Sequence, residues 1–108
     1  MKVSLKYLKF LEQNGEKIKE IFKDEIGIAY AEIKESKLHY HTFIHEWYIV
    51  VEGYGRLYLD EKVILIEKDD IVHIPPGVKH KVEGDPVVKV YVISNPAWRK
   101  EDHMLVSE

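Results

Sequence analysis

The sequence predicts a single all-β domain, an antiparallel barrel or sandwich with little helix. Three observations support this prediction. Runs rich in Val, Ile and Tyr follow one another at short spacing, clusters of Gly, Pro and Asp separate them, and no long stretch keeps a helical period. At 108 residues the chain has room for one domain with one hydrophobic core.

Short runs of β-branched and aromatic residues define the predicted strands. In chain order these are Ile28–Lys34, Leu38–Thr42, His45–Glu52, Arg56–Leu59, Val63–Glu67, Ile71–Ile74, Lys79–Val82 and Val87–Ser94. Residues that favour turns stand between several of them. The predicted turns are Gly53-Tyr54-Gly55, Leu59–Lys62, Pro75–Gly77 and Gly84–Pro86.

Residues 1–108 are predicted to form one domain whose barrel spans residues 26–94. Residues 1–25 would be an N-terminal extension, in which Ser4–Leu11 and Lys17–Lys23 fit either a short helix or an edge strand. An N-terminal strand added across a dimer is one way to cover a sheet edge. Residues 95–108 read as a charged tail, a loop or a short helix.

Composition excludes several classes of protein. The formal net charge of −3 argues against the broad basic surface that a nucleic-acid partner requires. No apolar run approaches the roughly 20 residues that span a bilayer, and no signal peptide is visible, so we expect a cytoplasmic protein without a membrane partner. Many Lys and Glu residues beside only one Gln and two Asn hint at a thermophilic source.

The absence of cysteine narrows the chemistry further. Disulfides, thiolate metal sites and cysteine nucleophiles are all excluded. Any metal must therefore be held by nitrogen and oxygen ligands.

Three histidines and a glutamate form a candidate metal site. His39 and His41 lie two apart on a predicted strand, so both imidazoles project from one face. Glu46 opens the next strand after a short turn, and neighbouring strands lie about 4.8 Å apart. His80 follows the Pro75–Gly77 turn at the start of another strand. Such a ligand set suits one divalent transition metal: Fe, Mn, Ni, Zn, Co or Cu.

Two motifs carry a resemblance to the cupins. His39-x-His41-x4-Glu46-x6-Gly53 is similar to the first cupin motif, and Pro75-x-Gly77-x2-His80 is similar to the centre of the second. The sequence departs from the family pattern at three positions, where the family residue shapes the backbone or a turn and is not a metal ligand. Ile33 and Asp69 replace the leading glycines, and Gly84 replaces the asparagine that often closes the second motif.

The resemblance implies a double-stranded β-helix, or jelly-roll barrel, with the metal inside its cup. It also implies frequent homodimers. The expected function is that of a small metalloenzyme whose oxygen-bearing substrate chelates the metal, for dioxygenation, isomerisation or decarboxylation. The alternatives are a non-catalytic binding or sensing module, a sugar-phosphate isomerase, and a barrel with a closed structural zinc site. The sequence leaves open whether the protein is an enzyme.

Three residues are candidate substrate contacts. Tyr48 shares the strand face of Glu46 and could either orient a substrate or fill the barrel. Arg56 has the guanidinium that suits a carboxylate or phosphate, although a surface position fits it equally. Tyr30 is the third candidate.

The other histidines are predicted to lie outside the metal site. His45 precedes Glu46 directly, and strand alternation places it on the opposite face as an exposed or interface residue. His73 is expected to point away from the metal, and His103, in the tail, is expected to be solvated.

Overall fold

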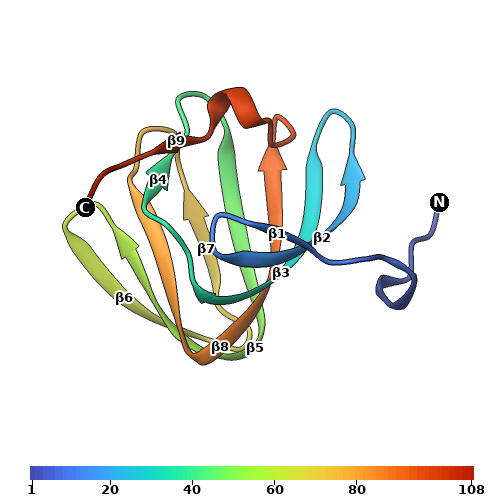
Figure 1. Ribbon diagram of the computed structural model, residues 1–108, viewed down its shortest axis with the longest axis horizontal. Coiled ribbons are helices and arrows are strands. Elements are labelled where there is room, and N and C mark those ends of the chain that lie inside the picture. Colours follow the sequence, from blue (N-terminus) through green and yellow to red (C-terminus); the bar gives the residue numbers. More distant parts are fainter.

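The computed structural model describes residues 1–108 as a curled antiparallel β sheet, which confirms the predicted all-β jelly-roll class (Figure 1). Its nine strands are β1 (Leu11–Gln13), β2 (Glu16–Lys23), β3 (Gly27–Glu35), β4 (His39–Tyr40), β5 (His45–Leu59), β6 (Lys62–Glu67), β7 (Ile71–Ile74), β8 (His80–Asn95) and β9 (Met104–Leu105). Two short 3₁₀ helices, Leu5–Tyr7 and Lys100–Asp102, are the only helical elements. Neither has the length needed to cross a bilayer.

The long strands β5 and β8 run side by side and belong to both layers of the barrel. The first half of β5 pairs with β7 and with the second half of β8, next to which lie β3 and β2. The second half of β5 pairs with β6 and with the first half of β8, next to which lie β4 and β9. Two facing layers therefore share the same pair of strands.

Glycines allow β5 and β8 to bend from one layer into the other. Gly55 pairs with Gly84, and the register shifts on either side of Gly53. Gly53 has a positive φ of 86°, which residues with a Cβ rarely adopt. The prediction of turns at Gly53–Gly55 and Gly84–Pro86 was therefore wrong, because these glycines mark bends inside continuous strands.

Replacing Gly84 by alanine should destabilise the protein by about 2 kcal/mol or more. A Cβ at this position would lie 2.3 Å from the carbonyl oxygen of Ile33 and 2.8 Å from the Cα of Val87, both backbone atoms. Gly77→Ala is the matched control, because Gly77 has a φ of 85° but no neighbour within 4 Å of the added Cβ. Urea denaturation would measure the free energy of unfolding of both variants. If Gly84→Ala lowered it no more than Gly77→Ala does, the backbone packed against Gly84 would not be the reason for a glycine there.

Alternate residues of the central strands face the interior. On β5, Glu46, Tyr48 and Val50 are buried, whereas His45, Trp47 and Ile49 lie on the outer face. The inner faces form one apolar cluster: Ala31, Ile33, Tyr48, Val50, Leu57, Ile66, Ile74, Val82, Val88 and Val90. Glu46 lies on the same inner face of β5 as Tyr48 and Val50, which belong to this cluster.

Both chain ends are structured more extensively than predicted. Lys17–Lys23, for which a strand or a helix was expected, is the main part of β2, so the barrel extends beyond the predicted boundary at residue 26. Met104 and Leu105 form β9 on the edge of β4, so the tail is more than a loop or a short helix. Homodimerisation stays a prediction, which light scattering of the purified protein would test.

Candidate metal centre

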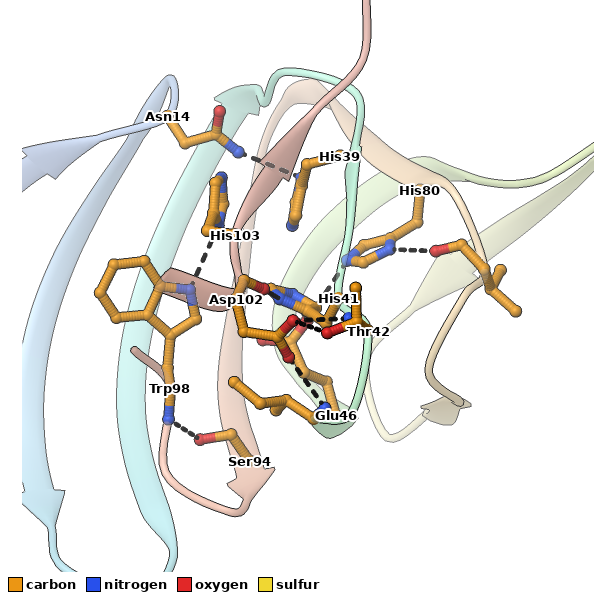
Figure 2. Close-up of polar contacts among 12 residues, drawn as sticks. Asn14, His39, His41, Thr42, Glu46, His80, Ser94, Trp98, Asp102 and His103 are labelled. Atoms are coloured by element: carbon orange, nitrogen blue, oxygen red, sulfur yellow. Dashed lines mark hydrogen bonds and ion pairs between the residues drawn. The ribbon is translucent and has the colours of Figure 1, made fainter. Parts of the chain in front are cut away.

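His39, His41, Glu46 and His80 come together inside the barrel. One ligand atom from each lies within 4.8 Å of the others, and none of the four residues is more than 5% exposed (Figure 2). His39 on β4 pairs directly with His80 on β8, and His41 follows β4 by one residue.

Glu46 approaches the histidines from the opposite layer of the barrel. We expected it on a strand adjacent to the His39–His41 segment, but β4 pairs with β8 and β9 and does not pair with β5. The carboxylate instead reaches across the interior, where its Oε1 lies 3.0 Å from Nε2 of His41 and 3.2 Å from Nε2 of His80. One layer thus supplies the histidines and the other supplies the carboxylate.

Backbone carbonyls fix the orientation of all three imidazoles. Nδ1 of His39 donates to the Lys37 oxygen at 2.8 Å, and Nδ1 of His80 donates to the Val78 oxygen at 2.9 Å. Nδ1 of His41 donates to the carbonyl oxygen of Asp102 at 2.6 Å. A carbonyl can only accept, so each neutral ring carries its proton on Nδ1 and leaves a lone pair on Nε2.

The chemistry of this cluster fits a cation. Lone pairs on Nε2 of His41 and His80 face an ionised carboxylate at hydrogen-bond distance, and acceptors so placed need a proton or a metal ion between them. Burial alone would raise the pKa of Glu46, but the bonds from His41 and His80 hold it well below its usual range. Burial would lower the pKa of His41, but the Glu46 carboxylate raises it. A proton on His41 can therefore take the place of a metal.

Asp102 anchors the loop between β4 and β5 (Figure 2). Its fully buried carboxylate accepts the backbone N–H of Thr42 at 2.7 Å and those of Phe43 and Ile44 at 3.1 Å, together with the Thr42 hydroxyl. Burial would raise the pKa of this carboxyl, but the four bonds lower it. The sequence contained no signal for this role, because Asp102 lies about 60 residues from its partners in a charged tail.

His103 lies beside the metal cluster, which corrects the prediction that it is solvated. Its ring stacks on His39 with centroids 4.3 Å apart and an interplanar angle of 17°. Trp98 donates its indole N–H to Nδ1 of His103 at 3.2 Å. Burial and the nearby His41 lower the pKa of His103 to about 4. The ring is brought here because the tail pairs with β4.

A cavity opens from the metal cluster toward β2. It provides about 90 Å³ for water-sized molecules, enough for several waters or one small ring. Of the four cluster residues, His39 and Glu46 line it, whereas His41 and His80 do not. The remaining lining residues include Asn14, Glu16, Ile18, Glu20, Phe22, Lys23, Ala29, Tyr48, Trp98 and His103.

Of the three predicted substrate contacts, the structure places only Tyr48 at this cavity. Tyr48 is buried, and burial together with Glu46 and Glu16 raises its pKa well above its usual value. Arg56 is half exposed on the outer surface, where it pairs with Glu83 at 3.2 Å. Tyr30 also points outward and donates to Glu32 at 2.8 Å, because strand alternation turns it away from the buried Ala31. Neither Arg56 nor Tyr30 lines the cavity.

His45 and His73 lie outside the barrel. Nδ1 of His45 is 3.0 Å from Nε2 of His73, and both rings stack with Trp47 on the outer face. Both histidines therefore point away from the metal cluster, as strand alternation predicts.

Residues 29–94 match the family model of the cupin domain. The chain belongs to the cupin family. The match spans the whole ligand cluster, and it confirms the resemblance carried by the two motifs. An uncharacterized protein from Methanocaldococcus jannaschii is 36% identical over 67 residues, which are 60% of this chain and 54% of that protein. The chain thus spans about half the length of that curated relative.

Solved structures share the cupin fold over nearly the whole chain. A protein from Planctomyces limnophilus has a TM-score of 0.88 at 20% identity and covers 97% of this chain and 96% of its own. Pac13 of Streptomyces, described as a nucleoside dehydratase and solved with uridine, has a TM-score of 0.86 at 15% identity, covering 98% and 90%. Oxalate decarboxylase of Bacillus subtilis has a TM-score of 0.81 at 12% identity, covering 96% and 32%.

Proposed function

We propose that this cupin binds one divalent transition metal through His39, His41, Glu46 and His80, and acts on an oxygen-bearing small molecule that enters the cavity. One observation carries the proposal. Three buried imidazoles, each with Nδ1 bound to a backbone carbonyl, bring a ring nitrogen within 4.8 Å of an oxygen of the buried Glu46 carboxylate, and His41 and His80 direct Nε2 at it. Carbonyl partners of this kind fix the tautomer and raise the basicity of metal-binding histidines.

The position of the cavity supports an open centre over a closed structural zinc site. His39 and Glu46 face the cavity, so a small molecule there would meet the cluster from that side. A bound divalent transition metal would supply Lewis-acid polarisation of an oxygen atom of the substrate. Tyr48 lines the same space and offers a hydroxyl for orienting the substrate. The buried walls exclude bulk water from the cluster.

The alternative of a sugar-phosphate isomerase has less support. A phosphate in the cavity would need several cationic groups. Lys23 is the only lysine in the lining, which contains no arginine. Pac13 is named a nucleoside dehydratase and the Bacillus subtilis protein an oxalate decarboxylase. Both names refer to small oxygen-bearing molecules, which agrees with the broader proposal.

The metal content of purified variants tests the ligand set. Wild-type protein, reconstituted with Fe²⁺, Mn²⁺, Ni²⁺, Co²⁺ or Zn²⁺ and then desalted, should retain one ion per chain by elemental analysis. His41→Ala and Glu46→Ala should lose the ion, because each removes a ligand from a buried set. His73→Ala is the matched control and should keep it, because His73 lies on the outer face.

Two outcomes would contradict the proposal. If Glu46→Ala retained stoichiometric metal, the ligand set would be wrong. If the metal-loaded wild type failed to turn over any of a panel of diols, ketones and hydroxy acids, while still binding some of them, the protein would be a non-catalytic binding module.

A further inference from the structure

The cavity lining carries hydrogen-bonding groups, outside the metal cluster, that have no partner among the side-chain hydrogen bonds. Oδ1 of Asn14 and Nε2 of His103 are buried and have no partner. The Glu16 carboxyl, 9% exposed, takes part in none of the side-chain hydrogen bonds of the structure. Buried polar groups in proteins are nearly always paired, so the unpaired atoms of Asn14 and His103, two residues that line the cavity together with Glu16, point to a ligand at this wall.

These groups have a defined hydrogen-bonding character. Trp98 donates to Nδ1 of His103, so the neutral ring carries its proton on Nε2, which is a donor. The unpaired oxygen of Asn14 is an acceptor. Burial is the first cause that raises the pKa of Glu16, and a protonated carboxyl offers both a donor and an acceptor.

The charge of the lining argues against an anionic ligand. Besides the neutral Glu16 carboxyl, the cavity faces two carboxylates, on Glu20 and Glu46, and one lysine. A desolvated anion needs cationic partners beyond the metal itself, and this wall supplies none besides Lys23.

The remaining surface of the cavity is apolar and partly aromatic. Ile18, Phe22, Ala29 and Trp98 line it beside the polar groups. A flat ring would bury its faces against these side chains while its edge reached the unpaired polar atoms.

We infer that Asn14, Glu16 and His103 form a recognition wall for an uncharged, hydroxyl-bearing ring compound, which they hold against the metal cluster. This inference rests on the proposed metal-binding function and names its substrate class. A hydroxyl both donates and accepts, so it can satisfy a donor and an acceptor on the same wall. Glu16 and His103 act here as substrate-binding residues and contribute no metal ligand.

Catechol and phthalate provide a matched pair of probes. Both are flat rings with two adjacent oxygen-bearing groups that can reach a metal, but catechol is uncharged near pH 7 and phthalate is a dianion. Zinc-loaded protein avoids redox chemistry with catechol. Isothermal titration should show that the wild type binds catechol at least about tenfold more tightly than phthalate.

Substitutions in the wall locate the binding. Glu16→Leu and His103→Phe should each weaken catechol binding by about tenfold, because each removes a hydrogen-bonding group while keeping an apolar side chain of similar size. Glu12→Gln on β1 is the control and should bind catechol like the wild type, because Glu12 lies outside this cavity. Zinc content should stay at one ion per chain in all three variants.

Three results would overturn the inference: phthalate binding as tightly as catechol, catechol binding unchanged in both wall variants, or no binding of either probe by zinc-loaded protein. Each can be told apart from failure of the metal proposal. If the proposed metal binding were wrong, the wild type itself would hold no zinc before any probe was added.

Discussion

Replacing Asp102 by alanine is expected to lower the free energy of unfolding of the metal-free protein by about 3–5 kcal/mol. The fully buried carboxylate accepts three backbone N–H groups and one hydroxyl from residues 42–44. Alanine would remove the partner of all four donors, including the N–H of the fully buried Ile44, whereas Thr42 and Phe43 are exposed. Urea denaturation at pH 7 in the presence of a chelator measures the change.

The same substitution should weaken zinc binding by about 10- to 100-fold. The carbonyl of residue 102 accepts the Nδ1 proton of His41, and the carboxylate holds the loop that follows His41. Competition with a chromophoric chelator would measure zinc affinity. Glu101→Ala is the matched control, because Glu101 is exposed and one residue away. Equal zinc affinity in Asp102→Ala and Glu101→Ala would show that the loop does not depend on this carboxylate.

Glu16→Gln is expected to stabilise the metal-free protein near neutral pH. The pKa of Glu16 is raised from 4.5 to about 8 in the folded state, so between these values the folded chain binds a proton that the unfolded chain has released. The contribution of Glu16 to the free energy of unfolding is most favourable below pH 4.5, falls as the pH rises toward 8, and is constant above pH 8. At pH 7 the loss amounts to about 3 kcal/mol, which the uncharged glutamine avoids.

Unfolding free energies of the wild type and Glu16→Gln between pH 5 and pH 9 would test this prediction. The difference between the two proteins should grow with pH and level off above pH 8. Glu12→Gln should show no such trend, because Glu12 is exposed on β1. Parallel pH curves for the wild type and Glu16→Gln would mean that Glu16 ionises in its usual range.

Local patterns predicted most of the strands and the face on which each side chain lies. Alternation along β5 places Glu46, Tyr48 and Val50 inward and His45 outward, because successive side chains of any strand point to opposite faces. The bends at Gly53 and Gly84 could not be recognised as such. A glycine in a turn and a glycine at a crossing of two strands look alike until the facing backbone is known.

The sequence by itself determined the all-β class, because strand periodicity is a property of consecutive residues, and the spacing within two motifs indicated the four residues that converge. The jelly-roll topology followed only from the resemblance to the cupins. Only the tertiary structure decided what surrounds these four residues. Asp102 and His103 reach the site because β9 pairs with β4, and Glu16 reaches it because β2 forms a wall of the barrel. Pairings between distant segments depend on how the whole sheet closes, and no short stretch of sequence encodes that closure.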